Sequence, residues 1–208
     1  SQLYFIKKQK FNLKQISEKY NLDQSKALIL FTLHPIIKIK NAQKKDIDEI
    51  FKSLKYLLKK NQLIITYPNF DPGYKYIIKK IKEIKKNNKN VKVFKHLGRK
   101  NYHSLLYYIG KKKNGFCMGN SSSGIKEAVI FKCPALNVGD RQKSRLKSKN
   151  VIDVDADKNK ILKSSNIKLK KYDNCKNPYE LKKIFKFLPD NILKKLSRED
   201  IINKKCTI

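Results

Sequence analysis

The feature that most constrains the fold is a repeated alternation of short apolar runs with longer amphipathic segments. The apolar runs have the length of strands and few polar interruptions, which is typical of strands that are buried on both faces. Such strands, separated by helices, form a parallel sheet with a helical layer on each side. Because crossovers between parallel strands are right-handed, the sequence predicts an α/β fold with a Rossmann-like, doubly wound parallel sheet.

The same pattern places the individual elements. Apolar runs predict strands at residues 27–33, 63–67, 91–94, 115–118, 134–138 and 151–154. Apolar residues at helical spacing predict helices at residues 13–20, 44–60, 74–86, 102–109, 124–131 and 179–188. No internal repeat or low-complexity linker interrupts the pattern, so we expect one Rossmann-like domain over residues 26–170.

The composition is strongly basic, with 50 Lys and Arg against 17 Asp and Glu and a formal net charge of +33. A charge of this size often indicates a nucleic-acid partner. However, only four of the 50 basic residues are arginine, the residue that suits base edges and bidentate contacts with phosphate. We therefore interpret the lysine excess as diffuse over the surface and expect no specific nucleic-acid partner.

The cysteines are few and widely spaced. Cys117, Cys133, Cys175 and Cys206 form no CxxC pair and no Cys/His pair at the spacing of metal ligands, so we expect no metal site and a reduced, cytoplasmic protein. No apolar stretch approaches the roughly 18–20 residues that a membrane span needs. The first residues lack the charged and apolar regions of a secretory signal, and we expect neither membrane insertion nor secretion.

Polar residues of rare types follow the predicted strands directly. His34 follows the first strand, Asn69 the second and His96 the third, while the run Gly119–Gly124 and Arg141 follow the fourth and fifth. The carboxyl ends of parallel strands meet at one edge of a sheet, where ligands of this fold class bind. We therefore expect these groups to surround a single crevice.

The run Gly119-Asn-Ser-Ser-Ser-Gly124 is the most informative of these segments. Its glycines permit a tight turn, and its serines bring hydroxyl and N–H groups to the start of a predicted helix, where an anion such as a diphosphate is favoured. An equally weighted alternative is that Ser122 or Ser123 merely caps the helix. No Gly-Lys-Ser/Thr ending follows, so the run is not a Walker loop.

Three further side chains have both a functional and a structural interpretation. Glu127 lies about one turn into the predicted helix, where its carboxylate can accept hydrogen bonds from two ribose hydroxyls or can be an exposed first-turn acid. Arg141 follows a glycine after a strand, and its planar fork suits phosphate. His34, held in front of Pro35, suits a general acid or a neutral donor to phosphate, although a lone histidine is more often structural.

The remaining polar residues near these turns divide between site and surface. Asn69 leaves its strand through a Pro/Gly turn and can donate to a phosphate, whereas Asp71 is interpreted as the cap of the following helix. His96 lies on a loop, in either a functional or a structural role. We expect His103 and Arg145 to lie on the surface.

Four motifs occur in order between residues 26 and 165. They are Thr32-Leu-His34-Pro35, Tyr67-Pro-Asn69-x-Asp71-Pro-Gly73, Gly119-Asn-Ser-Ser-Ser-Gly-Ile-Lys-Glu127 and Asn137-Val-Gly-Asp-Arg141-Gln142. Together they resemble the C-terminal half of the UDP-N-acetylglucosamine 2-epimerase family. The Gly-Asn-Ser-Ser-Ser-Gly and Gly-Asp-Arg-Gln-x-x-Arg runs resemble the hydrolysing branch of that family.

The resemblance implies a GT-B arrangement of two Rossmann-like domains, of which this chain is the C-terminal one and binds UDP or a UDP-sugar. It implies that residues 1–25 are an interdomain segment with a short helix, that residues 171–208 are C-terminal helices packing back on the domain, and that an N-terminal half missing here carries the catalytic carboxylates. The implied reaction needs no cofactor. It converts UDP-GlcNAc, or a related UDP-HexNAc, to N-acetylmannosamine and UDP by elimination and hydration, for sialic or related nonulosonic acid synthesis.

The resemblance also implies roles for single residues. The diphosphate is faced by His34, Asn69, Ser121, Ser122 and Arg141. His34 is also a candidate for proton transfer, Glu127 takes the ribose hydroxyls, the loop at His96 and Leu97 receives the uracil, and Asn120 joins the UDP-binding set. We expect the chain alone to bind UDP but to turn over poorly, and homo-oligomer formation stays open.

Two other functions are compatible with the sequence. The donor-binding half of a GT-B glycosyltransferase has the same crevice and the same use of a glutamate for ribose, but the His-Pro and Gly-Asp-Arg-Gln motifs argue against it. A basic polyanion-binding protein would bind with a steep dependence on salt and without preference for UDP.

Overall fold

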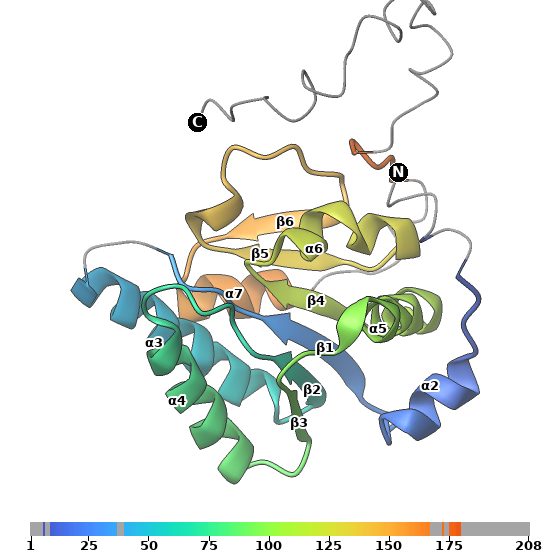
Figure 1. Cartoon of the computed structure of the whole chain (residues 1–208), viewed down its shortest axis with the longest axis horizontal. Coiled ribbons are helices and arrows are strands. Elements are labelled where there is room, and N and C mark those ends of the chain that lie inside the picture. The colour runs from blue at the N-terminus through green and yellow to red at the C-terminus, as the bar shows by residue number, and fades with distance from the viewer. Residues whose placement is uncertain (1–5, 7–8, 37–39, 167–171, 173–174, 180–208) are drawn as a thin grey trace, which may run out of the picture.

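A six-stranded parallel sheet forms the centre of the computed structural model, which describes residues 6, 9–36, 40–166, 172 and 175–179 (Figure 1). Its strands are β1 (Ala27–Thr32), β2 (Asn61–Thr66), β3 (Val91–Phe94), β4 (Gly115–Gly119), β5 (Ala135–Val138) and β6 (Val151–Val154). They lie in the order β3-β2-β1-β4-β5-β6, and every neighbouring pair is parallel. The predicted fold class is confirmed.

The strands are largely apolar because the inner ones contribute to a core on both faces of the sheet, whereas the edge strands β3 and β6 each carry one charged residue. In β1, Ile29 and Phe31 pack into one core, while Leu28 and Leu30 pack into the other, and all four side chains are at most 1% exposed. Successive side chains of a strand point to opposite faces, so a strand that is covered on both sides shows no alternation of apolar and polar residues. Burial on both faces therefore accounts for the pattern that predicted the sheet.

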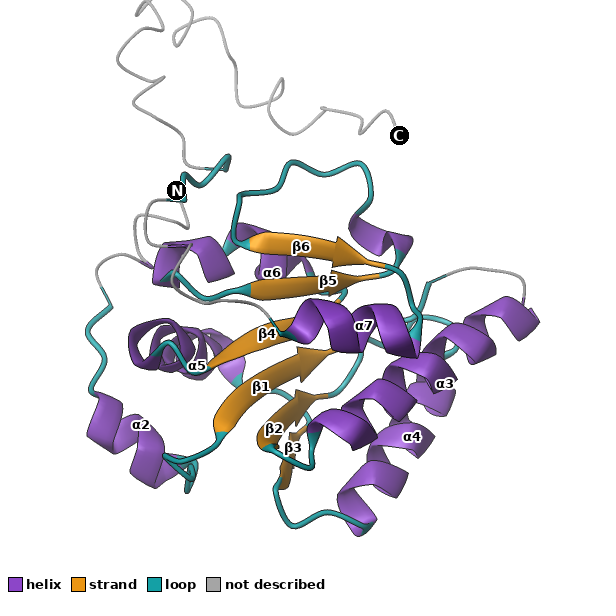
Figure 2. Cartoon of the chain, turned by 180° about the vertical axis from the view of Figure 1, so that it is seen from behind, coloured by secondary structure: helices purple, strands orange, loops and turns teal. Residues whose placement is uncertain are grey.

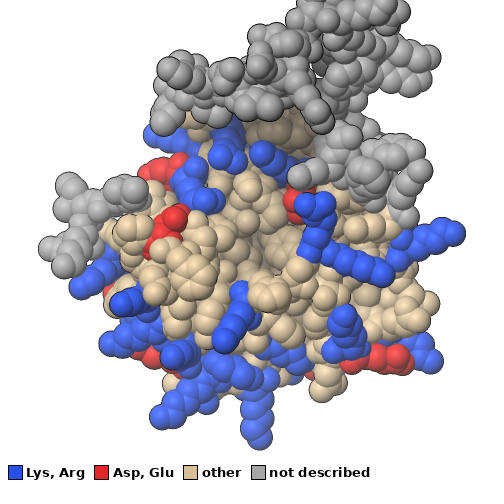
Figure 3. All heavy atoms as spheres, viewed as in Figure 1, with Lys and Arg blue, Asp and Glu red and all other residues tan. Residues whose placement is uncertain are grey.

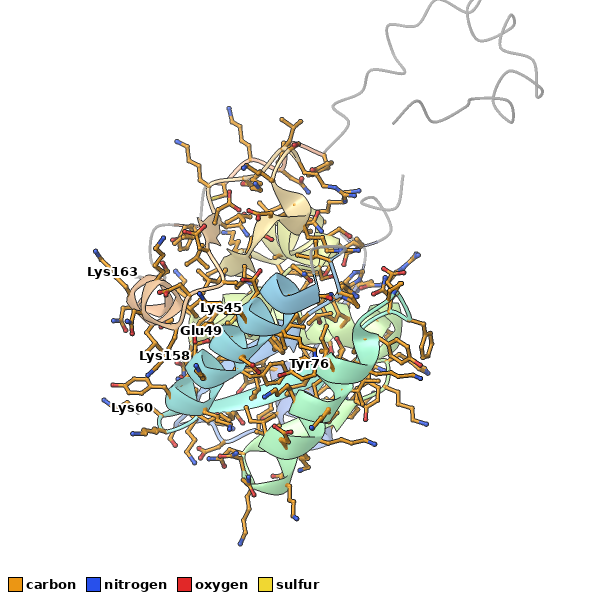
Figure 4. All side chains as sticks on the ribbon, turned by 90° about the vertical axis from the view of Figure 1, so that its left-hand side faces the viewer. Lys45, Glu49, Lys60, Tyr76, Lys158 and Lys163 are labelled. Atoms are coloured by element: carbon orange, nitrogen blue, oxygen red, sulfur yellow. The ribbon has the colours of Figure 1, made fainter. Side chains whose placement is uncertain are left out.

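The helices form one layer on each face of the sheet (Figures 1 and 2). One layer contains α3 (Lys40–Leu57), α4 (Tyr74–Lys86) and α7 (Lys158–Ser165), and the other contains α2 (Leu13–Lys19), α5 (Gly98–Lys112), α6 (Ser122–Lys126) and a 3₁₀ turn at Ala128–Phe131. In the first layer, Glu49 of α3 accepts a hydrogen bond from the main-chain N–H of Lys158 at the start of α7, a contact whose two residues are labelled in Figure 4.

The predicted helix at 124–131 differs from the structure. The segment forms the short helix α6 and then, after Glu127, the separate 3₁₀ turn. This turn brings the carbonyl oxygen of Phe131 against α5 at Gly110, where a Cβ would lie 1.8 Å from that oxygen. A tertiary contact of this kind leaves no trace in helical periodicity, whereas the other predicted strands and helices agree with the structure to within a few residues. The helix predicted at 179–188 lies outside the described residues apart from Tyr179, as does most of the tail at 171–208.

On the face seen in Figure 3, lysine and arginine side chains are scattered and do not gather in one patch. This distribution supports the interpretation that the basic charge is diffuse. Among the described residues, no helix combines the length and the apolar character that crossing a membrane requires.

Candidate functional site

An open groove of about 340 Å³ lies at the carboxyl edge of the sheet, across the junction of β1 with β4. Five of the predicted site residues line it, and they come from turns that follow β1, β3 and β4 and from the end of α6: His34, His96, Leu97, Ser121 and Glu127. Asn69, Asn120 and Arg141 lie next to the groove and connect to it through hydrogen bonds or charge. Ser122 is the first residue of α6 and is not part of the groove wall.

The ring of His34 is fixed by the turn that follows β2. The main-chain N–H of Asn69 donates to His34 Nδ1 at 3.1 Å, and the side-chain oxygen of Asn69 lies 3.2 Å from the same nitrogen. The tautomer that accepts this N–H bond carries its proton on Nε2, and the tautomer that donates to the Asn69 oxygen carries it on Nδ1. Burial, and then the positive charge of Arg141, lower the pKa of His34, which keeps the ring uncharged at neutral pH.

Asn120 connects the ends of β4 and β1 from within the fold. Its side chain is fully buried, and it accepts a hydrogen bond from the main-chain N–H of His34 at 2.7 Å and donates one to the carbonyl oxygen of His34 at 2.8 Å. The side chain thus pairs with both main-chain groups of His34, as a neighbouring strand would. In this arrangement the side chain of Asn120 positions His34, and its place in the UDP-binding set, which the resemblance implies, stays a prediction.

The carbonyl oxygen of Asn120 in turn fixes Arg141. Arg141 Nη1 donates to it at 3.1 Å and Gln142 Nε2 at 2.8 Å. A guanidinium has five N–H donors, so this bond orients Arg141 and leaves most of its donors for an anion. Arg141 and His34 are therefore held by the same residue, as the prediction of a single crevice requires. Gln142 belongs to the sequence motif, but its positioning contact was not predicted.

The serines at the start of α6 do not cap that helix with their side chains. Ser121 is the N-cap residue and makes no side-chain cap bond. The hydroxyl oxygen of Ser123 lies 2.8 Å from the hydroxyl oxygen of Tyr102 and 3.0 Å from that of Ser121, so it supports Ser121 from behind. Burial raises the pKa of Tyr102 well above its ordinary value, and its hydroxyl stays neutral. This arrangement favours the anion-binding interpretation of the serine run over the capping interpretation.

Glu127 has a partner that the sequence reasoning missed. Its Oε2 lies 3.1 Å from His103 Nε2, and His103 is completely buried. The prediction that His103 lies on a helix surface is therefore wrong. The helix α5 begins at Gly98, earlier than predicted, and His103 shares its inner face with Leu106 and Gly110, three and seven residues further on. That spacing to a buried leucine was the available signal.

The three described cysteines are free thiols, of which Cys175 is only partly buried. Cys117 and Cys133 are free and buried, and burial raises the pKa of Cys117 to about 11. Within the described part of the chain, no group of three or more His, Cys, Asp or Glu side chains is placed to hold a metal ion.

Sequence comparison connects this geometry to known enzymes. Residues 4–186 match the model of a family described as UDP-N-acetylglucosamine 2-epimerase. The chain is 39% identical over 144 residues to GDP/UDP-N,N'-diacetylbacillosamine 2-epimerase (hydrolyzing) of Campylobacter jejuni, which covers 68% of this chain and 36% of the relative. It is 31% identical over 163 residues to UDP-N,N'-diacetylbacillosamine 2-epimerase (hydrolyzing) of Legionella pneumophila, which covers 76% and 41%. The chain thus spans about two fifths of the length of these curated relatives.

Solved structures share the fold. The UDP-GlcNAc 2-epimerase of Neisseria meningitidis bound to UDP-GlcNAc superposes with a TM-score of 0.61 at 18% identity, over 87% of this chain and 48% of the other. The enzyme of Methanocaldococcus jannaschii, in complex with UDP-GlcNAc and UDP, superposes with a TM-score of 0.56 at 22% identity, over 86% and 47%. Because the family model matches residues 4–186, which is most of this chain, the chain belongs to the UDP-N-acetylglucosamine 2-epimerase family.

Proposed function

We propose that this chain is the UDP-binding part of a hydrolysing 2-epimerase that converts UDP-GlcNAc, or a related UDP-HexNAc, to N-acetylmannosamine or its corresponding derivative and UDP. The observation that carries the proposal is the shared attachment of a neutral His34 and the cationic Arg141 to Asn120, beside a groove lined by Ser121 and Glu127. Hydrogen-bond donors and one positive charge on one side, with a carboxylate on the other, match the diphosphate and the ribose of a nucleoside diphosphate.

In this proposal the diphosphate lies against the turns that follow β1, β4 and β5. His34 donates from Nε2, Arg141 donates from its unused N–H groups, and Ser121 donates from its hydroxyl and main chain. Asn69 fixes the His34 ring and faces the same phosphates, and Ser122 adds a donor at the start of α6. These groups are held before the ligand arrives, so they need little reorganisation to stabilise charge.

The nucleoside lies along the other part of the groove. Glu127 accepts hydrogen bonds from the two ribose hydroxyls. The loop at His96 and Leu97, which lines the groove between β3 and α5, receives the uracil. The same set of contacts would accept a guanine base only if this loop left more room, which makes base preference a direct test of the assignment.

The proposed chemistry is an elimination followed by hydration. A base removes the proton at sugar C2, the bond from C1 to the diphosphate oxygen breaks, and UDP departs with the electron pair. Water then adds to the resulting glycal and gives the free 2-epimeric sugar. The residues on this chain stabilise the negative charge on departing UDP, and His34 is the candidate for giving it a proton.

The base at C2 is assigned to a second, N-terminal Rossmann-like domain whose carboxylates close over the groove. The partial coverage of the relatives supports this division of labour. Residues 1–25 then serve as the interdomain segment and residues 171–208 as the helices that return to that domain. Buried free thiols fit the cytoplasm, where nucleotide sugars of this kind would be consumed in nonulosonic acid synthesis.

A panel of UDP, GDP, CDP and ADP tests the proposal by thermal shift and calorimetry. We expect UDP to raise the melting temperature selectively and UDP-GlcNAc to be hydrolysed poorly by the 208-residue chain alone. Loss of the UDP response in Glu127→Gln would place the nucleotide in this groove. Equal responses to all four diphosphates, or none, would contradict the proposal, and binding abolished by moderate salt would indicate a polyanion binder instead.

A further inference from the structure

Three side chains from distant parts of the sequence meet in the wall behind the groove. His103 of α5 is fully buried, and both of its ring nitrogens have a side-chain partner. Nδ1 lies 3.1 Å from Oε1 of Gln9, and Nε2 lies 3.1 Å from Oε2 of Glu127. Gln9 precedes α2, so the contact connects the N-terminal segment to the carboxylate that lines the groove.

The contact with Glu127 determines which nitrogen of the His103 ring carries a proton. An ionised carboxylate is an acceptor only, so Nε2 of His103 must donate to Glu127. A neutral ring then needs a donor at Nδ1, which the amide of Gln9 supplies when its NH₂ group faces the ring. A protonated ring needs an acceptor there, which the same amide supplies when its oxygen faces the ring. A glutamine side chain therefore satisfies either form of the ring.

Packing against aromatic side chains also restricts the ring of His103. It packs against Phe131 of the 3₁₀ turn with ring centroids 5.5 Å apart. Phe11, two residues after Gln9, packs against the same Phe131 at 6.0 Å and against Tyr107 of α5 at 5.4 Å. The N-terminal segment, α5 and the 3₁₀ turn therefore close around the imidazole and leave it one orientation.

We propose that His103, oriented by Gln9, is a positioning residue that holds the carboxylate of Glu127 in place to receive the ribose hydroxyls of the nucleotide. This inference rests on the proposed role of Glu127 in nucleotide binding. Glu127 sits where α6 ends and the 3₁₀ turn begins, and 28% of its side chain is exposed. A glutamate in such a junction has several rotamers, and fixing them before binding lowers the entropy that binding costs.

The bond to His103 also leaves the right atoms available. It occupies one lone pair of Oε2, so Oε1 and the second lone pair of Oε2 can still accept hydrogen bonds. Two vicinal hydroxyls need two acceptor sites on one side of a carboxylate. Glu127 can thus accept both hydroxyls while buried His103 holds its carboxylate and Gln9 of the N-terminal segment holds His103.

The test compares UDP with 2′,3′-dideoxy-UDP, which lacks both hydroxyls, by calorimetry on the 208-residue chain. His103→Leu removes the donor and keeps an apolar side chain, and His103→Gln is the matched control because its Nε2 can reach Glu127 in the same way. We expect His103→Leu to weaken UDP about tenfold, since a hydrogen bond to a charged group is lost. We expect dideoxy-UDP to be unaffected in this variant and His103→Gln to restore most of the UDP affinity.

The outcomes separate the inference from the function on which it rests. If the unaltered chain does not prefer UDP over dideoxy-UDP, the proposed nucleotide site fails and the inference fails with it. If the unaltered chain has that preference and His103→Leu keeps it, or loses affinity for both ligands equally, the positioning role alone is overturned. If circular dichroism shows that His103→Leu does not fold, Gln9→Met makes the same comparison. We expect this variant to lose a smaller part of its affinity for UDP and none for dideoxy-UDP. An unchanged preference for UDP would count against the positioning role.

Discussion

The side-chain oxygen of Asn120 lies 2.7 Å from the main-chain nitrogen of His34, and its amide nitrogen lies 2.8 Å from the His34 carbonyl oxygen. The same asparagine presents its own carbonyl oxygen to Arg141 at 3.1 Å. The side chain of Asn120 thus holds the main chain of His34, and its main-chain carbonyl oxygen holds the guanidinium of Arg141, the two residues that we assign to the diphosphate. The geometry of the site depends on this residue although its side chain is fully buried.

Asn120→Ala should lower both stability and UDP affinity. The substitution leaves the N–H and C=O groups of His34 without their buried partner, and each unsatisfied group costs about 1–3 kcal/mol, so we expect the free energy of unfolding to fall by about 2–4 kcal/mol. Urea denaturation measures this change. Asn87→Ala, at an exposed helix end, is the matched control and should change stability by less than about 0.5 kcal/mol. Equal effects at the two positions would show that the hydrogen bonds between Asn120 and His34 contribute little to stability.

His34 should make stability depend on pH in the acidic range. Burial and the charge of Arg141 lower its pKa in the folded protein below the ordinary value of 6.5, so the unfolded chain takes up the proton first. Stability from this source is present above about pH 6.5 and is lost as the pH falls toward the folded pKa.

We therefore expect the free energy of unfolding to drop more steeply between pH 7 and pH 5 in the unaltered protein than in His34→Gln. Urea denaturation at several pH values gives the difference between the two curves, in which the other titrating groups cancel. Parallel curves would mean that His34 titrates as it does in the unfolded chain.

Arg141→Gln should weaken UDP binding about tenfold or more, because a charge-assisted contact with the diphosphate is lost. The salt dependence of binding should become shallower in the same variant. Arg145→Gln is the control, since Arg145 is exposed and four residues away in sequence, and it should stay within about twofold. Calorimetry at two salt concentrations measures both effects, and equal losses in the two variants would point to a general charge effect.

Gly119→Ala should prevent normal folding of the β1–β4 junction. Its φ is +130°, and a Cβ would lie 1.9 Å from the carbonyl oxygen of Thr32, which is main chain and cannot move aside. We expect a loss of more than about 3 kcal/mol in the free energy of unfolding. Gly98→Ala is the comparison, because φ is +70° but nothing lies within 4 Å, so strain alone should cost about 1 kcal/mol. Similar losses at both positions would contradict the steric argument.

The sequence predicted the sheet well because burial on both faces leaves a signal in each strand separately. It also predicted which edge carries the site, since parallel strands bring their following turns together. His103 was missed although it lies within the predicted helix, because its partners Gln9 and Glu127 are 94 and 24 residues away in sequence and leave no local pattern. The bridge from Asn120 to His34 could not be predicted, because it joins residues 86 positions apart and neither shows a local pattern for it.

The pairing of β1 with β4 divides the molecule into two halves, and the groove takes Leu97 and His34 from one half and Ser121 and Glu127 from the other. A bound molecule would therefore contact both halves at once and add to the β1–β4 ladder and the hydrogen bonds of Asn120 and Glu49 that already join them. Amide hydrogens of β1 and β4 would then exchange more slowly when the groove is filled. The backbone of these two strands would report occupancy even for ligands that touch neither of them.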